Sequence, residues 1–395
     1  MMAAGTAASR GRKVLLLEKN RNLGEKLKIS GGGRCNITNA EESESLLLSN
    51  YGKARRFLYS SFSQFGMRDT FIFFEKQNLP LVVQARKRAF PKTEKALDVF
   101  KALERYMKQG GVEVRSQASV QAIVGSGKKI SHILVKGHEL TASSYILATG
   151  GKSHPETGST GDGFAWLAKL GHTVIDSTPT IVPLAVQEPW VKSLAGVSLS
   201  AMKITLFVDG KSVIKKKGKI LFTHFGFSGP MILNLAAQVS DLLHAGVVTA
   251  EIDAYPDTNL GVLDKKVIKV FNANKNKTLK NIFSEITPDG MSEALLALLT
   301  FDSDIKVNSV TKEQRQEIIN LLKAMPATIT GLMGTDRAVI TDGGIDIKEV
   351  DGKTMRSRLY NNLYLTGDLL HISRPSGGYS LQLCWTTGFV AGSHA

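Results

Sequence analysis

A run of apolar residues that ends on an acid is the feature of this sequence that most constrains its fold. Val14 to Leu17 are apolar without interruption, Glu18 follows them, and three glycines, Gly31 to Gly33, begin thirteen residues later. An unbroken apolar strand is typical of a parallel sheet that is covered on both faces. An acid at the end of such a strand binds ribose hydroxyls in dinucleotide-binding βαβ units, and glycines let the backbone approach a ligand closely. Each signal alone has a plain explanation, a solvated strand end or a flexible loop, but their spacing predicts a nucleotide site.

The rest of the chain alternates between helix and strand patterns. Helices are expected over residues 1–11, 53–78, 92–109 and 381–391, and strands over 112–115, 119–124, 130–135, 145–151 and 363–366. Two of these strands lead into glycine turns, Gly150-Gly151 and Gly367-Asp368. The alternation predicts an α/β fold.

The pattern changes near residue 184 and returns near residue 329. Between them come strand-like stretches at 202–208, 219–222 and 247–252, followed by a helical, Lys-rich region at 261–327. A chain of 395 residues is also too long for one ordinary core. We therefore expect a discontinuous nucleotide-binding domain made of residues 1–183 and 329–395. The insert would consist of a β-rich domain, 184–260, and a helical subdomain, 261–328.

The composition is that of a globular protein with a basic surface. Lys and Arg number 50 against 35 Asp and Glu, which gives a net charge of +15, and 43% of the residues are hydrophobic. Such a charge suits an anionic ligand or a nucleic acid. The basic residues are scattered, however, without interleaved aromatic residues or an RNA-binding signature. A solvated basic surface is therefore the favoured interpretation, and nucleic acid is not the expected partner.

Cysteine content and hydropathy indicate the compartment. The two cysteines, Cys35 and Cys384, cannot form a disulfide framework, and no metal-ligand pattern occurs. No apolar run approaches the ~20 residues that a membrane span requires, and no secretory signal pattern opens the chain. These features predict a cytoplasmic protein with neither a metal site nor a membrane partner.

Four segments resemble one bacterial flavoprotein family, in order and over nearly the whole chain. They are KVLLLEKN…GEKLKISGGGRCNITN at residues 13–39, LATGGKSHPETGSTGDGF at 147–164, LFTHFGFSGPMIL at 221–233, and a stretch at 341–392 that includes YLTGDLLHISRPSGGYSLQL. The chain is similar to the NAD(P)/FAD-dependent oxidoreductases that include aminoacetone-oxidase-like enzymes and BaiN-like flavin reductases. The resemblance implies a Rossmann-like FAD-binding domain that is interrupted by a β-rich and helical insert, with FAD bound non-covalently.

Carried over residue by residue, the resemblance implies an FAD site drawn from both parts of the domain. Glu18 would bind the adenosine ribose, Arg34 and Asn36 would contact the pyrophosphate and the flavin side, and Val120 would face the adenine through its backbone. The full predicted FAD-binding set is Glu18, Lys19, Gly33, Arg34, Cys35, Asn36, Val120, Thr149, Gly150, Gly367, Asp368, Gly378, Tyr379, Ser380, Leu381 and Gln382.

The C-terminal motif would lie against the flavin itself. Thr149 and Gly150 would line the pyrophosphate, Gly367 and Asp368 would lie by the ribityl chain, and residues 378–382 would lie against the pyrimidine end of the ring. The helix that starts there can direct backbone N–H groups at flavin atoms N1 and O2, where negative charge develops on reduction. The segment 369–375 and the Asp at 368 depart from the family pattern, so the substrate is not copied from relatives.

The sequence leaves the catalytic residues unassigned. Arg374 and Tyr379 are candidates because they flank the flavin motif, with surface and ring packing as the alternative. Cys35 lacks a resolving cysteine and is expected to be a packed residue. The glycine cluster at 158–163 has the wrong spacing for a second nucleotide fingerprint, so NAD(P)H would bind only transiently as the electron donor.

The expected function is an FAD-dependent oxidoreductase that transfers a hydride between FAD and a small molecule. Oxidation of an amine or α-aminoketone by oxygen and reduction of an unsaturated carbonyl compound both remain open. A tRNA-modifying type of flavoprotein is the alternative, because of the basic charge.

A further hypothesis concerns the start of the chain. The ribose-binding acid ordinarily lies ~20 residues after the start of the glycine fingerprint, and counting back from Glu18 reaches Met1. A start that lacks the first strand and its phosphate-binding turn would be FAD-deficient.

Overall fold

The computed structural model describes residues 1–333 and 340–395, and the chain divides into two compact units. Unit 1 comprises Met1–Thr178 and Val339–Ala395, and unit 2 comprises Pro179–Ala338. The expected α/β fold class is confirmed. Part of the predicted segment 329–395, residues 334–339, lies outside the described residues, and the predicted domain boundaries at 183/184 and 328/329 remain predictions.

Unit 1 is built on short parallel strand pairs. Strand β1 (Leu15–Leu17) pairs with β5 (Glu113–Arg115), and β9 (Tyr145–Leu147) pairs with β18 (Leu363–Leu365). Parallel strands have their carboxyl ends at the same edge, which is where α/β folds bind ligands. The expectation that β1 is buried on both faces is wrong, because Leu15 keeps 36% of its surface exposed. Among the described residues β1 pairs with β5 alone, so its other edge carries no strand.

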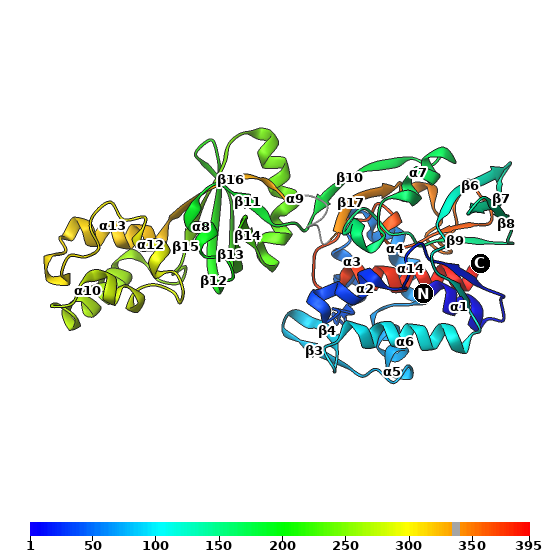
Figure 1. Cartoon of the computed structure of the whole chain (residues 1–395), viewed down its shortest axis with the longest axis horizontal. Helices are drawn as coiled ribbons and strands as arrows, with labels where there is room; N and C mark the ends of the chain where they lie inside the picture. The colour runs from blue at the N-terminus through cyan, green and yellow to red at the C-terminus, as the bar shows by residue number, and fades with distance from the viewer. Residues whose placement is uncertain (334–339) are drawn as a thin grey trace. The chain divides into compact units, whose positions relative to one another are not determined.

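The first and last helices of the chain pack along each other in unit 1 (Figure 1). They are α1 (Met2–Ser9) and α14 (Tyr379–His394). Small residues allow the close approach, because a methyl group placed on Gly392 would lie 2.4 Å from the carbonyl oxygen of Ala3. Arg10 also donates to the carbonyl oxygen of Gly392 at 3.1 Å. The two helices are buried along most of their length and form a central layer of the unit.

The other elements of unit 1 surround this layer. The helices are α2 (Glu25–Ile29), α3 (Glu44–Ser49), α4 (Arg55–Gln64), α5 (Met67–Lys76), α6 (Ala96–Gln109) and α7 (Asp162–Lys169). Two antiparallel sheets comprise β2 (Thr38–Asn39), β4 (Arg88–Pro91) and β3 (Leu81–Gln84), and β6 (Val120–Ser126), β7 (Lys129–Val135) and β8 (His138–Leu140). Strand β10 (Val174–Thr180) pairs with β17 (Ile340–Ile345). The single helix expected over 53–78 is divided at Gly66, whose N–H donates to Asp69 at 2.8 Å and caps α5.

Unit 2 contains a closed antiparallel barrel. Its strand order is β11 (Leu184–Val186), β14 (Gly226–Ser228), β13 (Lys211–Thr223), β12 (Ser198–Val208), β15 (Val248–Asp253) and β16 (Met325–Leu332). The helices are α8 (Pro189–Ser193), α9 (Pro230–Ala245), α10 (Leu260–Ala273), α11 (Leu279–Ile282), α12 (Ser292–Leu296) and α13 (Lys312–Lys323). The three strands expected in the insert are confirmed within β12, β13 and β15, and the helical region is confirmed as α10–α13. Helix α9 was not expected.

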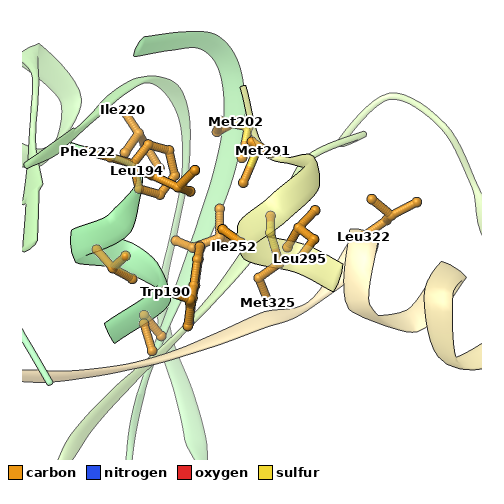
Figure 2. Packing of buried hydrophobic residues seen from close by; sticks show 14 of the residues in the cluster. Trp190, Leu194, Met202, Ile220, Phe222, Ile252, Met291, Leu295, Leu322 and Met325 are labelled. Atoms are coloured by element: carbon orange, nitrogen blue, oxygen red, sulfur yellow. The ribbon is translucent and has the colours of Figure 1, made fainter. Parts of the chain in front are cut away.

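One hydrophobic cluster runs through both the barrel and the helices of unit 2. Figure 2 shows Trp190 of α8, Phe222 of β13 and Leu295 of α12 in this cluster. The Trp190 and Phe222 rings lie 6.0 Å apart. The predicted division of the insert into two parts therefore remains a prediction. Within the described residues, no helix has both the length and the apolar character that crossing a membrane requires.

Candidate functional site

The acid-tipped strand β1 leads directly into a network at the carboxyl edge of unit 1. Glu18 accepts the N–H of Asn20 at 2.8 Å, and its carbonyl oxygen accepts the N–H of Ala118 at 2.9 Å. The second bond places Val120, at the start of β6, close to Glu18, so these two predicted adenosine contacts share one edge. Lys19 instead forms an ion pair with Asp162 at 2.8 Å, which ties its ammonium group to the 158–163 turn.

The glycine-rich segment has the backbone that its sequence predicts. Gly31, Gly32 and Gly33 have φ angles of +57°, +66° and +81°, in the left-handed region that favours glycine. The Arg34 guanidinium lies over the Phe90 ring at 4.3 Å and forms an ion pair with Glu94. The guanidinium group of Arg34 is thus directed toward the β3–β4 hairpin. Its Nε atom is buried without a hydrogen-bond partner in the described part of the chain.

Cys35 is a packed residue, as expected. Its side chain is fully buried in an apolar cluster, and its N–H donates to the carbonyl oxygen of Ser30 at 3.0 Å. Burial raises the pKa of the thiol to about 12, so the nucleophilic thiolate is scarce at neutral pH. Any contact of Cys35 with a ligand would therefore have to use its backbone.

The segment after Cys35 meets the start of α14, which joins two motifs that lie about 340 residues apart in the sequence. In the amide orientation that satisfies its donors and acceptor, Asn36 accepts the N–H of Gly378 at 2.9 Å. Thr38 donates to the side-chain oxygen of Gln382 at 2.6 Å, and Asn39 donates to the carbonyl oxygen of Gly377 at 3.1 Å. Glycine is required at 378, because a methyl group there would lie 2.3 Å from the carbonyl carbon of Thr38.

The ends of β9 and β18 bring a second predicted group together. The N–H of Thr366 donates to the carbonyl oxygen of Leu147 at 3.1 Å, so Thr149 and Gly150 lie at the same edge as Gly367 and Asp368. The hydroxyl of Thr149 is buried and has no hydrogen-bond partner among the described residues. The N–H of Gly367 donates to the Thr387 hydroxyl on α14 at 3.0 Å, which fixes this edge to the helix.

Arg374, one of the two catalytic candidates, makes polar contacts with three other residues. It forms an ion pair with Asp368 and donates to the carbonyl oxygen of Ile372 at 2.7 Å and to the Ser380 hydroxyl at 3.0 Å. Its side chain is 2% exposed, so it serves first to close the segment 368–374. The carbonyl oxygen of Tyr379 accepts the Tyr51 hydroxyl at 2.9 Å, and burial raises the pKa of the Tyr379 phenol. The Leu381 side chain packs on the apolar cluster that holds Cys35.

A partly buried lysine, Lys26, lies among these groups, and it was not predicted from the sequence. Its ammonium group lies 3.1 Å from the Ser153 hydroxyl, in the turn that follows β9. Burial lowers the pKa of this lysine, and the nearby charge of Asp368 opposes the shift. The neighbouring Lys28 instead pairs with Glu25 at 3.1 Å. The two lysines just before the glycines were the only signal that could have drawn attention to Lys26.

These residues fit an anionic dinucleotide. The edge combines a partly buried ammonium group, an unpartnered hydroxyl, left-handed glycines and the N-terminus of α14, whose first N–H groups have no partners within the helix. In the described part of the chain, no group of three or more His, Cys, Asp or Glu side chains could hold a metal ion.

Solved structures of a dehydrogenase and a reductase share this fold. A 3-ketosteroid Δ1-dehydrogenase from Sterolibacterium denitrificans is 13% identical with a TM-score of 0.51, covering 100% of this chain and 96% of that one. The FrdA subunit of Escherichia coli quinol fumarate reductase is 13% identical with a TM-score of 0.52, covering 99% of this chain and 68% of that one. At such low identity the likeness supports the fold alone.

Sequence relatives span the whole chain. The 3-dehydro-bile acid Δ(4,6)-reductase of Clostridium scindens is 29% identical over 100% of this chain and 96% of its own length. The ribosomal RNA dihydrouridine synthase of Escherichia coli is 25% identical over 99% of this chain and 94% of its own. The profile of the HI0933-like protein Rossmann domain matches residues 1–394. The chain therefore belongs to the HI0933-like family of Rossmann-domain proteins.

Proposed function

We propose that this protein is an FAD-dependent oxidoreductase that reduces a carbon–carbon double bond conjugated to a carbonyl group. Two sets of contacts carry the proposal: Asn20, which binds the Glu18 carboxylate, and Lys26 both donate to the segment after β9, and the segment after the glycines binds the start of α14. Bound FAD supplies a hydride donor and acceptor that no protein side chain provides. The residues of the chain supply binding, orientation and charge.

Different predicted residues bind different parts of FAD. Glu18 binds the adenosine ribose, and Val120 supplies the adenine contact. Lys26, together with the Thr149 hydroxyl, gives a positive charge and a donor for the pyrophosphate. The start of α14 presents backbone N–H groups to the pyrimidine end of the ring, where they stabilise the negative charge of the reduced state.

The chemistry of the relatives suggests the substrate class. The name of the Clostridium relative describes reduction of an unsaturated 3-keto compound, and dihydrouridine formation saturates a double bond beside a uracil carbonyl. Both reactions add a hydride and a proton across a conjugated C=C bond. We therefore favour an unsaturated ketone over the amine or aminoketone that an aminoacetone-oxidase-like enzyme would oxidise.

An anaerobic spectrum tests the proposal. The purified protein is treated with NADH or NADPH, which is expected to bleach the flavin band near 450 nm, and then with a steroid 4-en-3-one, which is expected to restore it. Peroxide release with aminoacetone in air, without reoxidation by the enone, would identify an amine oxidase. A flavin spectrum that changes with neither the substrates nor the nicotinamide would contradict both the enone reductase and the amine oxidase.

A second candidate function is reduction of a uracil base in RNA, and one surface favours it. Lys215, Lys217 and Lys219 alternate along β13, so they share one exposed face of the barrel. Lys217 pairs with Asp257 in the free protein; if phosphates replaced that partner, the three lysines would give a binding slope of roughly −2 against log salt for single-stranded RNA. Replacing all three by alanine should remove that slope, with the anaerobic flavin spectrum as the control for an intact site.

A further inference from the structure

We propose that His371 is a catalytic residue, the proton donor that completes the reduction by protonating the carbon next to the substrate carbonyl. This inference rests on the proposed function and names a residue that the family motif does not supply. It follows from how the segment 368–374 is folded and from what lies beside the imidazole ring.

The backbone fixes which way His371 points. Leu370 and Ile372 are 1% and 2% exposed and belong to the core of unit 1, whereas the His371 side chain between them is 36% exposed. In an extended segment, alternate side chains point to opposite faces. The N–H of His371 also donates to the carbonyl oxygen of Ile345 at 2.9 Å. The imidazole is therefore held at the surface by a rigid backbone.

The Asp342 carboxylate contacts only one of the two ring nitrogens of His371. The Nδ1 atom of His371 lies 3.4 Å from an oxygen of Asp342, and that same oxygen accepts the N–H of Gly343 at 3.1 Å. Nδ1 is buried and accepts or donates no hydrogen bond among the described residues, so its contact with Asp342 is one of charge alone. A carboxylate beside Nδ1 favours the ring orientation in which Nδ1 faces it. The Nε2 atom is left to meet a substrate.

The contact between the two segments is tight, so the pair is a feature of the fold. A methyl group on Gly344 would lie 2.6 Å from the carbonyl oxygen of Leu369. The backbone bridge between Ile345 and Leu370 continues the same contact. Backbone pairing of residues 344–345 with residues 369–371 thereby brings Asp342 close to His371.

The position of His371 suits the proposed flavin site. It lies midway between Asp368 and Arg374, whose ion pair closes this segment. Residue 368 is the proposed ribityl contact, and residues 378–382 are the proposed ring contacts. The charges of Asp368 and Arg374 offset each other in their ion pair, and Lys26 is close to Asp368. The carboxylate that contacts the His371 imidazole is that of Asp342.

The proposed step balances in protons and electrons. The hydride that adds to the β-carbon brings both electrons, and the π electrons of the C=C bond move toward the carbonyl group. His371 then gives the Nε2 proton to the α-carbon, and a new C–H bond forms as the N–H bond breaks. The substrate gains two hydrogens, bound FAD would supply the hydride with NAD(P)H as the reductant, and neutral His371 takes a proton from water.

The test compares the rates of enone reduction by the variants His371→Asn and Asp342→Asn with the rate of the control variant His132→Asn. His132 is a matched control, because its Nε2 atom lies 3.6 Å from Glu139 in the β6–β7–β8 sheet. We expect His371→Asn to keep its flavin and melting temperature but to reduce the enone 10²- to 10⁴-fold more slowly, the range for loss of a general acid.

A binding readout does not depend on turnover. In nitrogen-15 NMR of the wild-type holoprotein, a saturated ketone analogue should shift the ring signals of His371 and leave those of His132 unchanged. Wild-type rates in His371→Asn, or no shift at His371, would overturn the inference while the proposed function stands. If the wild type itself reduces no enone, the proposed function fails and the inference fails with it.

Discussion

Replacing Gly378 by alanine should destabilise unit 1 and weaken its hold on flavin. The residue has a φ angle of +102°, where an L side chain costs about 1–2 kcal/mol. Its new methyl group would lie 2.3–2.6 Å from backbone atoms of Thr38 and Asn39, which cannot rotate away. Overpacking of this kind costs about 1–3 kcal/mol more. The strain falls where β2 meets the start of α14, so the flavin-binding donors should also move.

Gly137→Ala is the matched control for this substitution. Gly137 has a φ angle of +79°, but a methyl group there would have no atom within 4 Å. It therefore pays the backbone cost alone, and the two variants should differ by about 1–3 kcal/mol. For a unit of this size each kcal/mol lowers the melting temperature by about 2–4 °C. Thermal unfolding followed by circular dichroism should place Gly378→Ala roughly 2–12 °C below Gly137→Ala. Equal melting temperatures would refute the close contact between the two motifs.

Three further predictions use other residues of unit 1. Lys26→Met should weaken FAD binding by roughly tenfold or more, since a charge-assisted hydrogen bond is worth about 1.5–3 kcal/mol, whereas Lys28→Met, which removes the partner of Glu25, should not; equal dissociation constants would contradict the proposed role of Lys26. Burial raises the thiol pKa of Cys35 and of Cys384 to about 12, so Ellman's reagent at pH 8 should react with both only after denaturation. Burial lowers the pKa of His172 below 6.5, so the unfolded chain binds more protons and the free energy of unfolding should decrease as the pH falls below about 6.5. Urea titrations of wild type and His172→Gln should differ in this slope, and identical slopes would show that His172 is not responsible.

The sequence predicted the parts of the fold that local patterns determine. The apolar strand with its terminal acid, the two strands that end near residues 147 and 365, and the helix after Gly378 all appear, because their periodicity and glycine positions are local properties. Helix α9 was not predicted, because it follows directly on strand β14 and is apolar on much of its surface. The exposure of β1 could not be predicted either, since it depends on which strands pair with it.

Side-chain partners at the candidate site depend on contacts that are distant in sequence. The Arg34 pattern suggested a phosphate contact, but its ion pair with Glu94 is made across 60 residues. The burial of Lys26 depends on the turn after β9, and the His371–Asp342 contact depends on the pairing of two segments of the C-terminal part. Sequence reasoning names the residue types that a site needs, whereas tertiary packing decides which of them are free to act.

The central claim is that the carboxyl edge of unit 1 binds FAD without a covalent bond. The direct measurement is to denature the purified protein with acid, separate the chain by filtration, and identify and quantify the released flavin by chromatography. The account predicts FAD in the filtrate, about one per chain after reconstitution with excess FAD, and no flavin left on the protein. FMN in the filtrate, flavin that stays on the chain, or no retained flavin after reconstitution would contradict it.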